Sequence, residues 1–285
     1  MPFTETSGTR ICWEESGSGE PLLLIMGATF PRQLWERAVR AFEPACRVIW
    51  YDNRGIGDSG RPSRPFTVGQ MADDARAVMD AAGVGRAAVY GVSMGGVVAQ
   101  ELALSSPDRV RSLVLGCTWA PAPDKSRASW SSQMRYRIPQ SLLVRLSVPL
   151  LYGPRRQKAM VREDLAVLRG VKIEPDSLRG QAEAVTAYSV EGRLGAIGVP
   201  VLVLHGDKDR VVPIAWGREL AAQLPSARFL SLAGAGHNYL TDATEESCRA
   251  VLSFLQDVAA PDGTIPERQG TGYSSSGSGD SASTD

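Results

Sequence analysis

The sequence places a serine on a short glycine-rich turn, in the stretch G-V-S-M-G at 91–95. An apolar run ending at Tyr90 comes directly before it, and a segment with helical spacing follows directly. A strand, a sharp turn and a helix hold a serine in a strained conformation above a sheet, and small residues two positions before and after it let neighbouring backbone come close. The pattern predicts that Ser93 is a nucleophile that attacks an acyl carbon.

The helix expected after Ser93 would add free N–H groups and the positive end of its dipole beneath a developing oxyanion. The N–H of Met94 is the natural first donor. One structural alternative is a turn that merely joins a strand to a helix, and another is a phosphate-binding loop. No Lys follows the glycines, and the spacing fits neither a Walker loop nor G-x-G-x-x-G, so nucleotide binding is not expected.

A serine nucleophile needs a base, and the chain contains only two histidines. His237 lies in a Gly-Ala-Gly-His loop after an apolar run, where the glycines let its ring reach Ser93, so we expect it to be the base. His205 ends a buried strand, and we expect it to be a packing or turn histidine. Asp207 and Asp209 both have the right position in the chain for the acid that orients the base.

The elements that must position these residues alternate along the chain. Helical spacing occurs at 68–82 and 95–104, between short apolar runs rich in Val, Ile and Leu that suit strands buried on both faces. These runs are Leu22–Met26, Arg47–Tyr51, Ala87–Tyr90, Ser112–Leu115, Val201–Leu204 and Phe229–Leu232. The alternation predicts an α/β fold with a mostly parallel sheet that helices cover on both faces.

Prolines interrupt this alternation between 119 and 193, where stretches such as 140–146 look like short helices. We interpret 119–193 as a helical cap, or lid, inserted before the strand that precedes the acid loop. The core then consists of 1–118 and 194–258. Residues 259–285 are rich in Ser and Gly with almost nothing apolar to bury, and are expected to form a disordered tail.

The charge of the predicted lid is uneven. Residues 125–172 contain eleven Lys or Arg and two acidic residues, a net charge of +9 in a chain that is neutral overall. Water can simply solvate these side chains on a thin lid. They could equally line an entrance for an anionic substrate or an acidic acyl carrier protein. Both interpretations stay open.

Composition excludes several other classes of protein. Lys plus Arg equals Asp plus Glu, at 31 each, so no nucleic-acid partner is expected. The four cysteines form no zinc-site or disulfide spacing, which favours a reducing compartment and no metal. No secretory signal begins the chain, and no apolar run approaches the ~20 residues of a membrane span. We therefore expect a soluble, cytoplasmic protein without membrane partners.

Taken together, four blocks of sequence resemble the α/β-hydrolase superfamily in content and order. They are L-L-L-I-M-G at 22–27, D-N-R-G-I-G-D-S at 52–59, the serine turn, and the pair H-G-D-K-D at 205–209 and G-A-G-H at 234–237. The likeness spans about 9–255 apart from the insertion. It implies that Asp209 is the acid, that Asp207 braces the loop, and that the N–H of Ala28 is the second oxyanion donor.

The chain departs from the family at Met26-Gly27, where relatives often have His-Gly, but a backbone donor tolerates this change. Some relatives draw the acid from the end of the preceding strand, where Asp124 is the only carboxylate nearby. The 52–55 stretch is expected to be structural, with Arg54 bridging backbone carbonyls. A serine at the turn excludes epoxide-hydrolase and haloalkane-dehalogenase chemistry, which needs a carboxylate there.

The chain most resembles bacterial enol-lactonases, polyketide methylesterases and thioesterases. This resemblance implies hydrolysis of a small-molecule carboxylic ester, lactone or thioester through an acyl-enzyme on Ser93, with no cofactor. The substrate would be an anionic or carrier-bound acyl group of secondary, polyketide-type metabolism. The alternatives are a non-hydrolytic enzyme on the same fold, such as a cofactor-free haloperoxidase or lyase, and a ligand-binding receptor.

Overall fold

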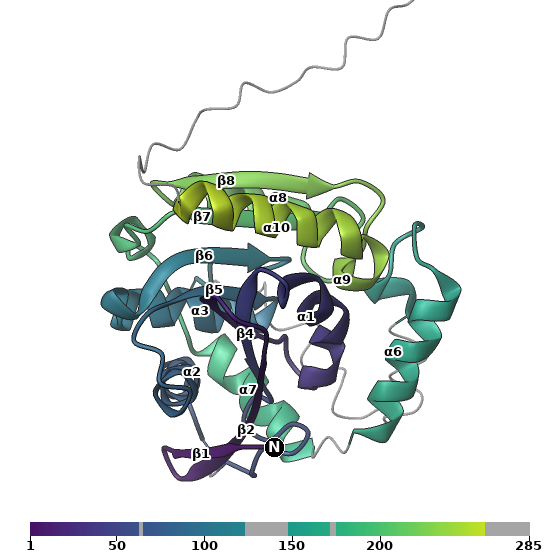
Figure 1. The fold of residues 1–285 in the computed structure, drawn as a ribbon. Coiled ribbons are helices and arrows are strands. Elements are labelled where there is room, and N and C mark those ends of the chain that lie inside the picture. Colours follow the sequence, from purple (N-terminus) through teal and green to yellow (C-terminus); the bar gives the residue numbers. More distant parts are fainter. Residues whose placement is uncertain (63–64, 123–147, 172–174, 260–285) are drawn as a thin grey trace, which may run out of the picture.

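The computed structural model describes residues 1–62, 65–122, 148–171 and 175–259, which include an eight-stranded sheet (Figure 1). The strand order is β1-β2-β4-β3-β5-β6-β7-β8. Strands β1 and β2 pair antiparallel with each other, β2 pairs antiparallel with β4, and the remaining pairs are parallel. The strands are β1 (Phe3–Thr6), β2 (Thr9–Ser16), β3 (Glu20–Ile25), β4 (Cys46–Tyr51), β5 (Ala87–Val92), β6 (Val110–Gly116), β7 (Val201–Gly206) and β8 (Ala227–Leu232).

Each of the six predicted apolar runs forms one of the strands β3 to β8, so the prediction of a mostly parallel α/β sheet is confirmed. Strands β1 and β2 were not predicted from the sequence. Strand β1 alternates exposed and half-buried residues, and β2 has polar residues at both ends. This hairpin lies at the edge of the sheet, where continuous burial is not required.

Helices cover both faces of the sheet. The described residues form α1 (Glu36–Phe42), α2 (Val68–Ala81), α3 (Met94–Ser105), α6 (Lys158–Gly170), α7 (Pro175–Thr186), α8 (Ile214–Ala222), α9 (Tyr239–Asp242) and α10 (Thr244–Ala259). Short 3-10 turns occur at Arg32–Trp35, Pro107–Arg109 and Leu194–Ala196. No helix among the described residues is both long and apolar enough to span a membrane.

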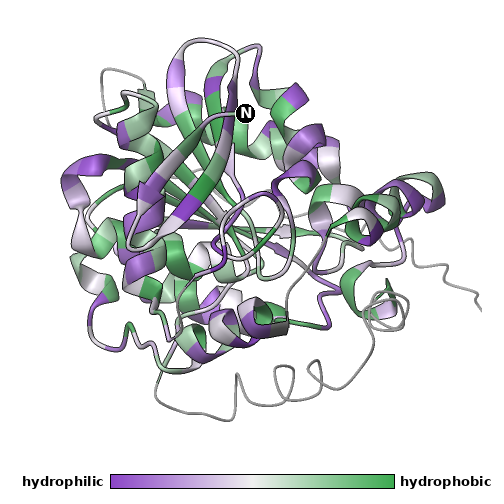
Figure 2. Ribbon diagram, turned by 90° about the horizontal axis from the view of Figure 1, so that it is seen from below, coloured by the Kyte–Doolittle hydropathy of each residue, from purple (hydrophilic) through white to green (hydrophobic). Residues whose placement is uncertain are grey.

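The sheet separates two hydrophobic clusters, one on each face, because successive side chains of a strand point in opposite directions. In β3, Leu23 packs with α2, α3 and α8 on one face, whereas Leu22 and Leu24 pack with α1 and α10 on the other. Figure 2 shows the hydrophobic strands enclosed in the middle of the fold. Helix α2 begins where the sequence provides a capping box, with the N–H of Gln70 donating to Thr67 Oγ1 at 3.1 Å.

Helices α6 and α7 belong to the predicted lid, between β6 and β7. Helix α6 stands beside α9 (Figure 1), and Asp164 on α6 accepts hydrogen bonds from Asn238 and Thr241. Helix α7 lies over the loops that follow β3 and β4, because its Gln181 bonds to the backbone of Thr29 and Arg54. The predicted helix at 140–146, Asp124 and the predicted tail beyond residue 259 lie outside the described residues, and the lid as a separate unit remains a prediction.

Candidate active site

Ser93 stands at the junction of β5 and α3 in a conformation that L residues rarely adopt, with φ 54° and ψ −121°. Two glycines make this turn possible. A Cβ atom on Gly91 would collide with the carbonyl oxygen of Gly95, and one on Gly95 would collide with that of Ile25. Such a backbone costs about 1–3 kcal/mol, and the surrounding sheet and helix maintain it. The half-buried Ser93 side chain is held at the carboxyl end of the central strands.

The structure brings together the three side chains predicted to be catalytic. His237 Nε2 lies 3.1 Å from Ser93 Oγ, and His237 Nδ1 lies 2.8 Å from Asp209 Oδ2. The three residues follow three different strands, β5, β7 and β8, whose carboxyl ends meet at one edge of the parallel sheet. The resulting line from carboxylate to imidazole to hydroxyl is the geometry needed to remove a proton from the serine.

Asp207 and Asp209 occupy different environments, which separates the two candidates for the acid. Asp207 Oδ1 accepts from the N–H of Gly234 at 2.6 Å and so braces the loop that carries His237. Asp209 contacts His237 itself. Its second oxygen, Oδ1, accepts from the N–H groups of Val211 and Val212 at 2.8 Å each.

The electrostatics of this pair follow from burial and proximity. Burial raises the pKa of Asp209, but the neighbouring charge of His237 and hydrogen bonds from His205 and His237 outweigh it and hold the pKa below its ordinary range. For His237, burial lowers the pKa, yet the charge of Asp209 outweighs it and raises the pKa above 6.5. The carboxylate therefore stays ionised and favours the imidazolium that proton transfer from Ser93 would create.

The predicted oxyanion donors lie beside the serine. A Cβ atom on Gly27 would be 3.2 Å from Ser93 Cβ and 3.8 Å from Oγ, which places the start of the 27–30 loop directly against the nucleophile. Met94 is the first residue of α3. Among the residues that the structure describes, the N–H groups of Ala28 and Met94 have no acceptor, so both are available to an oxyanion.

Two amide side chains hold the loop that carries Ala28. Asn53 Nδ2 donates to the carbonyl oxygen of Met26 at 2.9 Å, and Gln181 Oε1 accepts from the N–H of Thr29 at 3.1 Å. Thr29 itself has a positive φ of 68°. No sequence motif predicts this role for Gln181, because its partner is 152 residues away in the chain.

The role expected for Arg54 needs correction. Its guanidinium makes two hydrogen bonds of 2.6 Å to the buried carboxylate of Asp74. Within the part of the chain that the structure describes, it donates to one carbonyl oxygen, that of Gln70, at 3.2 Å. Arg54 therefore joins its loop to α2 mainly through a carboxylate. Asp52 in turn bonds to the buried Arg32. The 52–55 stretch is structural, as expected, but through ion pairs.

Cys117 is a further group near the base. It follows β6, is 2% exposed, and its sulfur lies within 4.8 Å of ligand atoms of both Asp209 and His237. Sulfur, imidazole and carboxylate are a set that transition metals accept. Here, however, Asp209 and His237 already bond to each other, and burial raises the pKa of the Cys117 thiol. The second group of this kind, Cys12 with Asp52 and Asp58, has Arg32 as a counter-charge.

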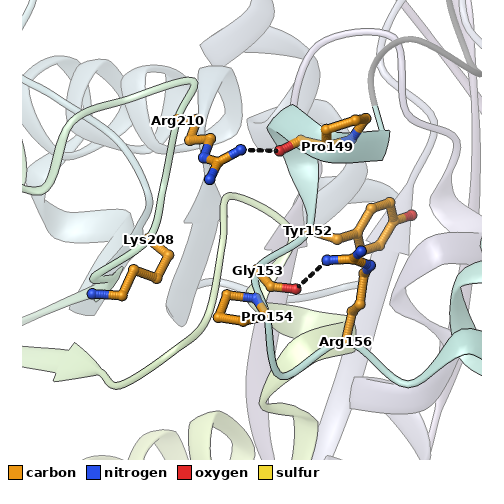
Figure 3. Close-up of a pocket in the computed structure, with 7 residues that line it drawn as sticks. All are labelled: Pro149, Tyr152, Gly153, Pro154, Arg156, Lys208 and Arg210. Carbon is orange, nitrogen blue, oxygen red and sulfur yellow. Dashed lines mark hydrogen bonds between the residues drawn. The ribbon is translucent and has the colours of Figure 1, made fainter.

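A pocket of about 340 Å³ adjoins the loop that carries Asp209 (Figure 3). Three of its lining side chains are cations: Arg156, Lys208 and Arg210. The other lining residues are Pro149, Tyr152, Gly153 and Pro154. Its volume falls in the range of small-molecule sites.

Two of the three cations donate hydrogen bonds only to backbone atoms among the described residues, although the charge of Arg156 also acts on the buried carboxylate of Asp242. Arg156 donates to the carbonyl oxygen of Gly153 at 3.0 Å, and Arg210 donates to that of Pro149 at 3.4 Å (Figure 3). Lys208 Nζ lies 3.2 Å from Asp207 Oδ2, so the two side chains form an ion pair. Arg155 is different, because it does not line the pocket and pairs with Glu246 at 2.8 Å.

The aromatic side chains near the lid and in the core occupy different environments. Tyr152 lines this pocket, Trp13 and Trp35 lie in the hydrophobic core, and Tyr188 is half-buried, with its hydroxyl 2.6 Å from Glu101. Trp119 packs against the core from a half-buried position. Trp130 and Tyr136 lie outside the described residues.

A family model described as the alpha/beta hydrolase fold matches residues 20–244. The chain therefore belongs to the alpha/beta hydrolase family, as its four sequence blocks, sheet order and serine turn led us to expect. It is 30% identical over 267 residues to the "Putative carbamate hydrolase RutD" of Azorhizobium caulinodans, covering 90% of this chain and 99% of that protein.

Two further relatives extend the comparison. The "Putative non-heme bromoperoxidase BpoC" of Mycobacterium tuberculosis is 30% identical over 268 residues, covering 88% of this chain and 99% of that protein. The crystal structure of the enol-lactonase from Burkholderia xenovorans superimposes with a TM-score of 0.80 at 25% identity, covering 90% of this chain and 100% of that one. The resemblance to enol-lactonases inferred from the sequence is thus confirmed.

Proposed function

We propose that this chain is a serine hydrolase that cleaves an ester bond through an acyl-enzyme on Ser93. The observation that carries the proposal is the unbroken line of hydrogen bonds from Asp209 through His237 to Ser93 Oγ. The likeness to an enol-lactonase supports it, because a lactone is a cyclic ester. Asp209 serves as the acid, and Asp207 braces the loop.

The reaction follows from this geometry. Ser93 Oγ attacks the acyl carbon while His237 Nε2 takes its proton, and the N–H groups of Ala28 and Met94 stabilise the oxyanion. His237 then gives the proton to the leaving oxygen or sulfur, and the acyl group remains on Ser93. A water molecule next loses a proton to His237 and attacks the acyl-enzyme, which releases the acid and returns the proton to Ser93.

For the substrate, we propose an ester, lactone or thioester with a negative charge, free or attached to an acidic carrier protein. The pocket lined by Arg156, Lys208 and Arg210 supports this choice, because its lining residues carry positive charge and no carboxylate. Arg guanidinium groups match the geometry of carboxylate and phosphate. The resemblance to polyketide methylesterases and thioesterases makes polyketide acyl groups the first substrates to test.

The proposal is tested with p-nitrophenyl esters of graded chain length, using the wild type and Ser93→Ala. We expect a burst of p-nitrophenol followed by turnover in the wild type, and a loss of roughly a thousandfold or more in the variant. A fluorophosphonate probe should label the wild type at Ser93. A wild type that shows neither turnover nor labelling would contradict the proposal.

A cofactor-free haloperoxidase is the second candidate, favoured by the likeness to the protein named as a bromoperoxidase. The two candidates separate when ester hydrolysis and peroxide-dependent bromination are measured on the same preparation. A kcat/KM for bromination that exceeds the value for every ester would favour the haloperoxidase. Saturable ligand binding with neither activity would favour a receptor.

A further inference from the structure

Both histidines of the chain contact the same carboxylate oxygen. His205, the fifth residue of β7, is completely buried, and its Nε2 lies 3.3 Å from Asp209 Oδ2. The same nitrogen lies 2.9 Å from the carbonyl oxygen of Val212. His237 Nδ1 lies 2.8 Å from Asp209 Oδ2, the same carboxylate oxygen. The sequence predicts a packing histidine at 205, and the observed burial agrees, but this contact was not foreseen.

The neighbours of His205 fix the position of its proton. The carbonyl oxygen of Val212 can only accept a hydrogen bond, and so can the ionised carboxylate of Asp209. His205 Nε2 must therefore carry the hydrogen and share it between the two oxygens.

The other nitrogen of the ring, Nδ1, has no group nearby, within the part of the chain that the structure describes, that could accept a hydrogen bond from it. His205 Nδ1 is buried without a hydrogen-bond partner among the described residues. It faces α8, where a Cβ atom on Gly217 would collide with it. A proton on Nδ1 would be left without an acceptor in an apolar environment, which is costly. The tautomer with its hydrogen on Nε2 fits this site.

We propose that His205 is a positioning residue, a permanent second hydrogen-bond donor that fixes Asp209 Oδ2 and weakens its hold on the proton of His237. The catalytic importance of this role rests on the proposed hydrolase function. The hydrogen bond itself and its effect on the pKa of His237 are properties of the resting protein and do not depend on that function.

The sign of the effect follows from the groups around His237. His237 faces Asp209 from the loop after β7, Cys117 from the end of β6 and Ser93 from the start of α3. With His205 removed, two backbone N–H groups still hold Asp209 Oδ1, so the carboxylate stays in place. Its Oδ2 then shares its charge with one donor fewer and binds the His237 proton more tightly.

The test uses full-length protein labelled with ¹⁵N-histidine. Because the chain has only two histidines, the spectrum contains two imidazole rings, and any His205 variant assigns them. We compare the wild type with His205→Leu, which removes the donor, and His205→Gln, which keeps an amide N–H near the position of Nε2. Leu204→Val is the control, since it alters the same strand on the opposite face.

In the wild type we expect His205 to carry its proton on Nε2 across the pH range in which His237 titrates. In His205→Leu the midpoint of the His237 titration should rise by about half a pH unit, and His205→Gln and Leu204→Val should stay near the wild type. A proton on Nδ1 of His205, or a midpoint in His205→Leu that stays in place or falls, would overturn the proposal. If His205→Leu fails to fold, the wild-type proton position and the His205→Gln titration decide alone.

The failure of this inference and that of the proposed function are distinguishable. If the wild type hydrolyses no ester, the hydrolase proposal fails and the spectra still report on His205. If hydrolysis is normal and the His237 midpoint does not respond to His205→Leu, only the role of His205 is lost. Among active variants, the acid limb of kcat/KM should move with the midpoint seen in the spectra.

Discussion

The side-chain carbonyl of Gln181 accepts a hydrogen bond from the backbone N–H of Thr29 at 3.1 Å. This bond joins α7, which lies between β6 and β7, to the residue immediately after Ala28. The amide group of Gln181 also donates to the carbonyl oxygen of Arg54 at 3.3 Å, so one fully buried side chain ties the helix to two loops. The helix therefore helps to set the position of the Ala28 N–H.

Gln181→Leu should lower kcat of ester hydrolysis by about tenfold, because the Thr29 N–H loses its acceptor and the Ala28 donor loses its fixed position. The effect on KM should be smaller, since the oxyanion forms only after binding. Arg179→Ala on the same helix is the control, as its side chain is 59% exposed. Steady-state kinetics with a p-nitrophenyl ester measure both. An unchanged kcat in Gln181→Leu would show that α7 does not position the loop.

The pH dependence of hydrolysis follows from the raised pKa of His237. The base must be neutral to accept the serine proton, so kcat/KM should rise as the pH rises through that pKa. Burial of the ring lowers the pKa of His237, but the charge of Asp209 raises it by more. Among the described residues, Cys117 is a further titratable group beside the ring. The half-maximal point of the acid limb should therefore lie above 6.5. A limb at or below 6.5 would contradict this assignment of the base.

Arg156→Gln should raise KM for an anionic ester by about tenfold and leave KM for a small neutral ester unchanged, because it removes one of three pocket cations. Arg155→Gln is the matched control, because Arg155 is the next residue in the chain and carries the same charge, but it pairs with Glu246 outside the pocket. KM values for succinyl and butyryl esters of the same alcohol give the comparison. Equal effects of the two variants, or equal effects on the two esters, would remove the argument for a charged substrate.

Asp164→Asn should lower the free energy of unfolding by about 2–3 kcal/mol, because this buried carboxylate serves several donors at once. It accepts from Tyr152, Asn238 and Thr241 and pairs with Arg37. The control is Glu163→Gln, which removes the 67% exposed partner of the same arginine and should cost less than about 0.5 kcal/mol. Urea unfolding measures both. Similar values for the two variants would mean that the Asp164 cluster does not anchor α6.

Local pattern was sufficient to predict the residues at the strand ends. Ser93 lies between an apolar run and a helical segment, and His237 lies in a glycine-rich loop shortly after another apolar run, so short stretches of sequence define both. Asp209 was separated from Asp207 only by family resemblance, and the structure supplies the physical reason in the Gly234 N–H that occupies Asp207.

The remaining contacts depend on where distant segments meet. Gln181 contacts a residue 152 positions away, and Arg37 reaches Asp164 across 127 positions. Neither pairing leaves a periodic trace in one sequence. His205 shows a different limit: its partner is only four residues away, but the contact depends on how the 207–212 turn folds back toward the strand.

The distribution of Ser93, Asp209 and His237 over three strands also determines when the protein can begin to work. Ser93 and His237 are separated by 144 residues, and the base follows the last strand of the sheet. A chain emerging from the ribosome would complete β5 and its nucleophile long before β8 exists, and parallel pairing of distant strands is slow. Recovery of hydrolysis during refolding should therefore coincide with the docking of the C-terminal strand, which makes activity a reporter of the final stage of folding.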